Sequence, residues 1–331
     1  MFFEEKVDPP PDVDIVRKSR FPRWQWFVLV PMMIVIILIV ILALLPVETD
    51  ASIPETEWGV GTDTIEPAWT GLKREWTPVL NVELGNPQLA NLGYELFFDP
   101  VLSGDNTYSC AHCHHPDRAF ADGLPVSVGV SGESLTRNAP TLWNVAFNTH
   151  FFWDGRASSL EEQLVIPITE PHEMNQNFSD LIAELNDIAD YSETFEDLFP
   201  DGITEQNLAS AIAAFERTLI SDGSAFDQYA DGATDALNAQ QRRGLGIFRS
   251  AATRCNECHT LPTFSGDDFR VTGVPGSPED IGYGALVEGN AMDYAFKIPT
   301  LRNTVLSGPY MHNGEYSTLE EIVDFYAKGG G

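Results

Sequence analysis

The sequence predicts a mostly α-helical protein in which two related domains follow one N-terminal transmembrane helix. Three observations support this prediction: an uncharged apolar run near the N-terminus, apolar residues at helical spacing in the middle of the chain, and one cysteine motif that occurs twice. A chain of 331 residues that is 43% hydrophobic is long enough and apolar enough to bury two modest cores beyond such an anchor.

The apolar run has the length and the flanks of a membrane anchor. Residues 26–45 span about 20 residues, the length that a helix needs to cross hydrocarbon. Basic residues precede this run and none follows until Lys73, so the positive-inside bias places residues 1–25 in the cytoplasm. A cleaved signal peptide is the alternative, but the run is long for one and residues 46–51 make a poor cleavage site. We therefore expect an uncleaved anchor over 26–45 and a tether over 46–86.

The rest of the chain is strongly acidic. Lys and Arg number 19 against 49 Asp and Glu, a net charge of −30, and residues 1–46 are neutral, so the whole charge lies beyond residue 46. Such a body repels phosphate backbones, which argues against a nucleic-acid-binding protein. The charge favours a basic protein partner, with solvation or salt tolerance as the alternative explanation.

Helix-like segments precede both cysteine motifs and lie between them. Residues 92–97 come before the first motif and residues 245–248 before the second, which indicates two related modules. Residues 178–199 and 204–220 are predicted as helices, the latter because apolar residues recur at spacings of three and four. A seam over 222–238 places the two domains at 87–236 and 237–331.

Two long loops and one short helix complete the expected structure. Regions 123–150 and 262–296 are rich in Gly, Pro and Asn, which is typical of loops. Residues 317–321 have the pattern of a capping box, and Gly329 is a suitable stop, so a helix is predicted over 318–328.

The four cysteines form two Cys-x-x-Cys-His motifs, made by Cys110, Cys113 and His114 and by Cys255, Cys258 and His259. Two thiols one helical turn apart can bond to the vinyl groups of a haem, and the adjacent histidine can reach its iron. A Cys₄ zinc site is the alternative, but it leaves both histidines and the export of the chain unexplained. The motifs therefore predict two cytochrome-c-like domains, each folded around one covalent haem c.

Further motifs surround these cysteines, namely 96–100 (LFFDP), 137–141 (RNAPT), 152–156 (FWDGR), 159–163 (SLEEQ), 171–174 (PHEM), 299–303 (PTLRN) and 309–314 (PYMHNG). With them, the chain from residue 92 to residue 330 resembles the bacterial di-haem cytochrome c peroxidases and their MauG-type relatives, which oxidise protein side chains. The resemblance covers most of the part of the chain beyond the anchor.

The resemblance implies roles for individual residues. The haem on His114 would react with peroxide, and Glu173 matches the carboxylate that moves a proton between the two peroxide oxygens. Gln163 matches a side chain that forms hydrogen bonds in the same pocket. Trp153 matches the tryptophan that lies between the two haems and carries electrons. Without the resemblance, these three residues would be a helix-start glutamate, a polar helix face and a core tryptophan.

The resemblance also implies a calcium ion between the haems. Asn138 and the carbonyl groups of Ser307 and Pro309 match its ligands. Oxygen ligands of this kind suit calcium.

Two departures from the peroxidase pattern concern the iron ligands. Residues 127–130 stand where many of the peroxidases carry a histidine that blocks the reactive iron, so we expect an open site, with His172 as a substitute candidate. Tyr326 stands where the peroxidases place a methionine ligand of the second haem, as it does in the MauG-type enzymes. A phenolate lowers the haem potential and a thioether raises it. The alternatives are Met311, no protein ligand in this position, or Met292.

These inferences predict a peroxidase that reduces hydrogen peroxide to water with electrons from a small c-type cytochrome or cupredoxin. One alternative is a MauG-like oxidase that modifies Trp or Tyr residues of a partner protein. The other is a membrane-tethered di-haem electron carrier. The anchor predicts a single-pass protein of the bacterial inner membrane with its catalytic part in the periplasm.

Overall fold

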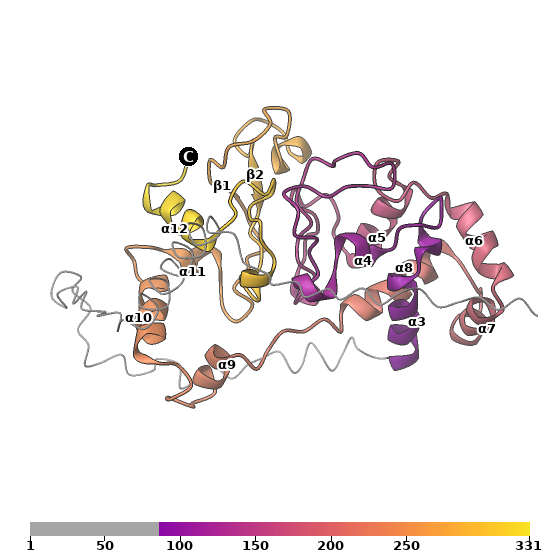
Figure 1. Ribbon diagram of the computed structural model, residues 1–331, viewed down its shortest axis with the longest axis horizontal. Helices are drawn as coiled ribbons and strands as arrows, with labels where there is room; N and C mark the ends of the chain where they lie inside the picture. Colours follow the sequence, from indigo (N-terminus) through magenta and orange to yellow (C-terminus); the bar gives the residue numbers. More distant parts are fainter. Residues whose placement is uncertain (1–85) are drawn as a thin grey trace, which may run out of the picture. The chain divides into compact units, whose positions relative to one another are not determined.

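The computed structural model describes residues 86–331, in which short helices alternate with long irregular loops (Figure 1). The helices are α3 (Pro87–Phe98), α4 (Cys110–Cys113), α5 (Leu160–Thr169), α6 (Phe178–Asp187), α7 (Ala189–Leu198), α8 (Glu205–Glu216), α9 (Ala225–Ala230), α10 (Ala239–Phe248), α11 (Cys255–Cys258) and α12 (Leu319–Ala327). The 3₁₀ turns are η2 (Pro100–Leu102), η3 (Pro116–Arg118), η4 (Val145–Phe147), η5 (Tyr283–Leu286) and η6 (Thr304–Leu306). The predicted mostly helical character is confirmed for this part of the chain.

The predicted membrane anchor over 26–45 lies outside the described residues, as does nearly all of the predicted tether. Within residues 86–331, no helix is long and apolar enough to cross a membrane. These residues belong to one compact unit. The domain boundary near residue 236 stays a prediction.

The first half of the described chain is built around α8. Helices α3 and α5 both pack against α8. Asn86 caps the start of α3, because its side chain accepts a hydrogen bond from Gln88 N, and Pro87 is the first residue of the helix. Gly93 faces the backbone of Ala211, where any Cβ atom would collide with the carbonyl group. The main buried core lies in this half of the chain, and its fully buried members include Leu92, Leu96, Phe97, Leu208 and Ile212.

The helix predicted over 178–199 is in fact two helices. Helix α6 ends at Asp187, Ile188 is extended with φ −96° and ψ 107°, and α7 begins at Ala189. The reason is the spacing of the buried residues: Leu185 of α6 and Tyr191 of α7 both enter the core. Six residues are not a whole number of helical turns, so one continuous helix would point these two side chains in different directions.

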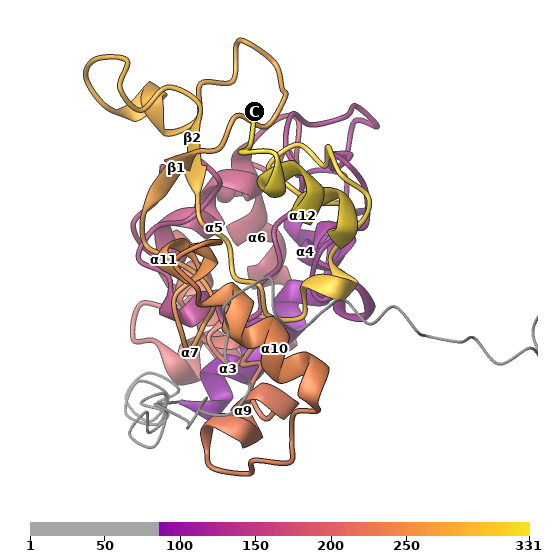
Figure 2. The same cartoon turned by 90° about the vertical axis from the view of Figure 1, so that its left-hand side faces the viewer.

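The second half carries α9 to α12 and a two-stranded sheet (left in Figure 1, facing the viewer in Figure 2). Strands β1 (Phe269–Val271) and β2 (Ala295–Lys297) are antiparallel, with Phe269 opposite Lys297. Region 262–296 was predicted as loop alone, because pairing of short strands across such a sequence distance leaves no local pattern. The predicted C-terminal helix is confirmed as α12, with the capping box between Thr318 and Glu321.

Candidate functional site

The first cysteine motif forms one helical turn that delivers a histidine for iron. Helix α4 carries Cys110 and Cys113, and His114 follows directly as its C-cap. The His114 Nδ1 atom donates to the carbonyl group of Phe120 at 2.9 Å, which leaves Nε2 free to bind a metal. Burial lowers the pKa of His114, so the imidazole stays neutral, which is the form that binds iron.

The second motif repeats this geometry. Helix α11 carries Cys255 and Cys258, and the Nδ1 atom of His259 lies 3.1 Å from the carbonyl oxygens of both Phe264 and Pro299. Nε2 is again the free ring nitrogen, and burial lowers the pKa of His259. The two histidines are therefore oriented alike by backbone acceptors.

A cavity of about 980 Å³ opens beside the first motif. Such a volume lies at the upper end of the range for cofactor sites. Its wall includes Cys110, Cys113 and His114, so the cysteine positions and the free histidine nitrogen fit a covalently attached haem.

The segments that adjoin the second motif fit a haem in a different way. Ile247 before α11, and Val305 and Leu306 after Pro299, are each more than half exposed. The buried hydrophobic cluster in this half is small, with Tyr229 and Leu237 as its buried members. A haem on His259 would supply the apolar surface that these side chains lack.

The structure brings the predicted catalytic side chains to the first cavity. Gln163 of α5 and Glu173, which follows this helix, both line its wall. Burial raises the pKa of Glu173, assisted by Glu170 and opposed by Arg156. A carboxyl group that holds its proton more readily than usual is suited to acid–base chemistry at neutral pH. The backbone also fixes this residue, because Val130 N donates to the carbonyl group of Glu173 at 2.8 Å.

The segment 127–130 lies against Glu173 and presents no histidine to the cavity. Ser127 and Gly129 line the cavity wall, and Ser127 Oγ donates to Asp122 at 2.6 Å. His172 also lines the cavity, but its ring is 65% exposed and lies 3.1 Å from Glu133. The structure therefore turns the His172 ring toward an exposed carboxylate.

Trp153 lies where the two halves of the chain meet. Its indole Nε1 donates to the carbonyl group of Asn138 at 2.9 Å, and its own carbonyl group accepts from Lys297 N of β2 at 2.8 Å. Arg137 reinforces this junction, because its guanidinium group pairs with Asp154 and Asp280, each at 2.7 Å. Trp153 is thus held from both sides on the wall of the first cavity.

Of the proposed calcium ligands, Asn138 lies at this junction, because its carbonyl group accepts the hydrogen bond from Trp153. Asn138 is buried, its Nδ2 atom donates to the carbonyl group of Leu124, and its backbone N donates to His312, three residues beyond Pro309. Ser307 follows η6. Within residues 86–331, no group of three or more His, Cys, Asp or Glu side chains is arranged to hold a metal ion. The predicted calcium site would use one side-chain amide and two backbone carbonyl groups, so this absence does not test it.

Tyr326 of α12 lies within electrostatic reach of the second cysteine motif. Burial raises the pKa of its phenol, a hydrogen bond with Thr272 lowers it, and Cys258 and Cys255 raise it further. Its side chain is nonetheless 47% exposed. Met311 adopts a left-handed backbone conformation with φ 72°.

Two charged residues on the first cavity were not predicted from the sequence. Glu216 ends α8 and Lys297 ends β2, and both are buried on the cavity wall. Burial raises the pKa of Glu216 to about 8 and lowers the pKa of Lys297 to about 8. No local pattern marks either residue, because their burial comes from packing against distant segments.

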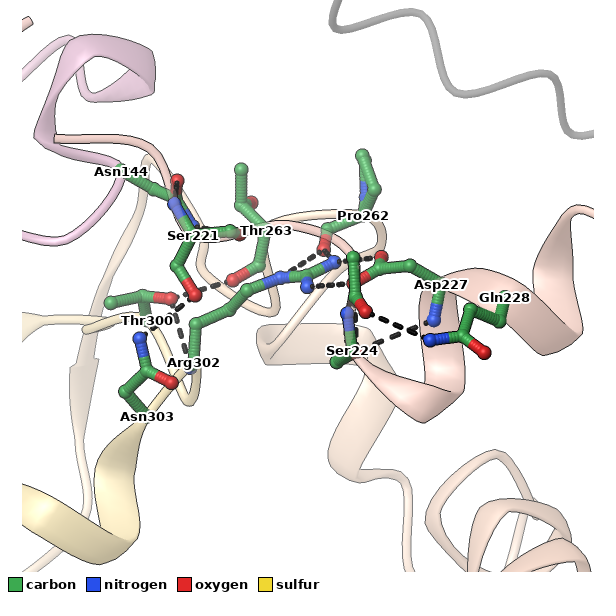
Figure 3. A network of polar contacts seen from close by, with 11 residues as sticks. Asn144, Ser221, Ser224, Asp227, Gln228, Pro262, Thr263, Thr300, Arg302 and Asn303 are labelled. Atoms are coloured by element: carbon green, nitrogen blue, oxygen red, sulfur yellow. Dashed lines mark hydrogen bonds and ion pairs between the residues drawn. The ribbon is translucent and has the colours of Figure 1, made fainter. Parts of the chain in front are cut away.

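A buried ion pair supports the loop that orients His259 (Figure 3). Both guanidinium NH groups of Arg302 donate to Asp227 at 2.7 Å, with side chains 4% and 1% exposed. Arg302 also donates to the carbonyl group of Pro262, and its guanidinium group lies 5.4 Å from the ring centre of Phe264. Since Phe264 accepts a bond from His259, the ion pair stabilises the histidine from behind.

These features define a class of protein: a redox protein with two covalently attached haems, one of which faces a cavity that holds an acid. The comparisons with known proteins agree with this class. A family model described as "Di-haem cytochrome c peroxidase" matches residues 87–235. The methylamine utilization protein MauG of Methylorubrum extorquens is 40% identical over 248 residues, which cover 74% of this chain and 70% of that protein. The cytochrome c551 peroxidase of Nitrosomonas europaea is 36% identical over 252 residues, 75% of each chain.

Solved structures show the same likeness. A MauG-like protein associated with microbial copper homeostasis has a TM-score of 0.69 at 30% identity, over 74% of this chain and 78% of that one. The diheme peroxidase BthA from Burkholderia thailandensis has a TM-score of 0.62 at 29% identity, over 73% and 71%. The chain belongs to the di-haem cytochrome c peroxidase family. It is a peroxidase-type oxidoreductase with two haem c groups.

Proposed function

We propose that this protein reduces hydrogen peroxide in the first cavity, on the haem attached at Cys110 and Cys113, and takes up electrons through the second haem. The observation that supports this best is the cavity itself, which brings together Gln163, Glu173 and Trp153 with the motif of His114. When bound, the haems supply iron centres that exchange electrons with peroxide and with a donor.

Glu173 is the proton-transfer group of this proposal. Its carboxylate would take a proton from one oxygen of peroxide and return it to the other, which would leave as water when the O–O bond breaks. Two electrons from the donor and two protons from solvent would release the remaining oxygen as a second water. Burial, which raises the pKa of Glu173, favours this exchange at neutral pH. Gln163 would orient the peroxide by hydrogen bonding, and Lys297 would supply a buried ammonium group to an anionic group of the bound cofactor.

A Glu173→Gln variant tests the proposal. We expect peroxide turnover with a reduced c-type cytochrome to fall about 10²–10⁴-fold, the usual contribution of a general acid–base group. The matched control is Glu133→Gln, which changes an exposed carboxyl group on the same cavity wall that pairs with His172 and is not among the groups that shift the pKa of Glu173. Full activity of Glu173→Gln, at equal haem content, would contradict the assignment.

A MauG-like reaction is the second candidate, and Tyr326 favours it. This phenol lies within electrostatic reach of Cys255 and Cys258, which would hold the second haem, and the MauG of Methylorubrum extorquens is 40% identical to this chain. In this reading, the oxidising equivalents of peroxide pass to Trp or Tyr residues of a partner protein. A long-lived oxidised state after one equivalent of peroxide supports it, whereas rapid decay with cytochrome oxidation supports the peroxidase.

The partner and the location complete the proposal. A basic c-type cytochrome or cupredoxin would be attracted to a chain of net charge −30, so turnover should fall as salt is added. The uncharged run over 26–45 would anchor the protein in the bacterial inner membrane, with the haems in the periplasm. Fractionation of the full chain and of a chain lacking residues 1–46 tests this: only the full chain should stay with the membranes.

A calcium ion between the haems is the remaining part of the proposal. Asn138 supports it, because this buried amide uses its Nδ2 atom on Leu124 and so directs its oxygen elsewhere. The carbonyl groups of Ser307 and Pro309 would complete the ligands, and oxygen donors of this type suit calcium.

A further inference from the structure

Glu216, the last residue of α8, places a buried carboxyl group on the wall of the first cavity. The residue is 3% exposed and lines the cavity together with Cys110. Its Oε2 atom has no hydrogen-bond partner among the residues that the structure describes. Buried carboxyl groups are nearly always hydrogen-bonded or paired with a cation, because an unpaired one costs free energy. The position therefore indicates a role that the surrounding side chains do not explain.

The charged side chains near Glu216 do not form a hydrogen bond with its Oε2 atom. Arg217, its neighbour in sequence, donates to both carboxylate oxygens of Glu161 at 2.8 and 3.0 Å. Burial raises the pKa of Glu216 to about 8, opposed by Arg217 and assisted by Glu161. Cys110 of α4 also lies within electrostatic reach, but its thiol is used in haem attachment.

The remaining helix that packs on α8 adds no buried charge near this position. Helix α3 carries Tyr94 and Glu95 as its ionisable residues, and both are exposed. Burial lowers the pKa of the iron ligand His114, and the backbone of Phe120, the charge of Asp122 and the backbone of Pro140 oppose this shift. Glu216 therefore lies on the cavity wall that Cys110 and His114 share, and its charge acts on the side chain of Cys110.

We propose that Glu216 is a redox-linked proton site of the first haem. When a one-electron donor reduces this haem, one proton from solvent adds to the Glu216 carboxylate and forms the O–H bond of a carboxylic acid. When the haem is oxidised again, the electron and the proton both leave. The physical reason is electrostatic: reduction adds one negative charge beside a carboxylate that is shielded from water, and this raises its affinity for a proton. The inference rests on the haem at Cys110, but not on which reaction that haem performs.

The test is a redox titration of the haem-loaded full chain, without peroxide or donor protein, over two pH units on either side of 8. In the wild type, one of the two haem waves should fall with rising pH, by up to about 59 mV for each tenfold change in proton concentration. In Glu216→Gln the slope of this wave should become clearly shallower, while the other wave stays unchanged. Any slope that remains near pH 8 would come from Lys297, which lines the same cavity and has a pKa of about 8. The matched control is Glu184→Gln, because Glu184 of α6 also has a buried oxygen without a partner but lies outside the cavity wall.

A second variant and a second signal keep the inference testable if Glu216→Gln fails to load both haems. Glu216→Asp retains a carboxyl group and should retain the pH dependence. Infrared difference spectra between the reduced and oxidised protein should show the C=O band of a protonated acid, and this band should be absent in Glu216→Gln. A wild-type wave that is independent of pH, or a slope in Glu216→Gln equal to that of the wild type, overturns the inference. The potentials are measured without peroxide, so absence of peroxidase activity would contradict the proposed function but not the proton site at Glu216.

Discussion

The buried ion pair between Asp227 and Arg302 offers a direct test of how the second half of the chain is held together (Figure 3). Asp227 lies on α9 and Arg302 lies 75 residues further along the chain, so the pair connects two distant segments. Replacing Asp227 with Ala leaves a buried guanidinium group without its carboxylate. Removing one partner of a buried ion pair typically costs about 3–5 kcal/mol.

The structure indicates that this loss should lie within that range and not below it. The side chains of Arg302 and Asp227 are 4% and 1% exposed, and both bonds are 2.7 Å long. Asp227 also accepts bonds from Ser224 at the start of α9, so Asp227→Ala removes a helix cap as well. An Asp227→Ala/Arg302→Met double variant removes the unpaired charge, and its loss should be smaller than the sum of the two single losses.

The assay is urea unfolding of the haem-loaded protein at neutral pH, followed by circular dichroism. The control is Glu257→Ala, which breaks an exposed ion pair with Arg254. The side chains of Arg254 and Glu257 are 68% and 52% exposed, so this change should hardly alter the free energy of unfolding. The reasoning is refuted if Asp227→Ala costs less than about 1 kcal/mol, or if the two single losses add fully in the double variant.

The same ion pair predicts that the free energy of unfolding decreases at acid pH. Burial alone would raise the pKa of Asp227, but the hydrogen bonds from Arg302 and Ser224 outweigh it, so the pKa lies below its ordinary value. A carboxyl group of this kind contributes stability that is fully present above the unfolded pKa of about 3.9 and is lost as pH falls through the lower folded value. Asp227→Asn should weaken this decrease at acid pH.

Three further predictions concern the haem sites. Trp153→Phe should slow electron passage between the haems and leave the first reaction with peroxide at its wild-type rate, measured by stopped-flow spectroscopy; equal turnover in both proteins would remove Trp153 from the path. Tyr326→Met should raise the potential of the second haem if the phenol is its ligand, because a thioether favours ferrous iron; an unchanged spectrum would exclude that ligand. A calcium chelator should reduce activity and thermal stability in the wild type but have little further effect on Asn138→Ala, and equal responses of the two proteins would contradict a site at Asn138.

The elements that local sequence determines were predicted correctly. Helix α12 follows from its capping box, since Thr318 and Glu321 bond to each other's backbone within one turn. The histidines His114 and His259 follow their cysteines directly, so a single turn is enough to place each beside its attachment site. Both features depend on residues that are close in sequence, and for this reason a pattern alone reveals them.

The helices of the first half show a feature that local sequence patterns did not predict. The apolar spacing within 178–199 is helical on both sides of Ile188, and nothing in it marks the break between α6 and α7. The break arises because Leu185 and Tyr191 must enter the same core, which is a property of the packed structure. The sheet between Phe269–Val271 and Ala295–Lys297 was missed for a similar reason, because its pairing joins distant segments.

Sequence by itself determined which groups are available: two haem attachment motifs, an acid, an amide and an indole in motifs of one family. Tertiary structure decided which of them share a cavity, and it added Glu216 and Lys297, whose shifted pKa values come from burial. It also decided the pairing of Arg302 with Asp227. The physical reason is that burial and charge pairing depend on contacts between residues far apart in the chain, whereas a motif records only the chemistry of neighbours.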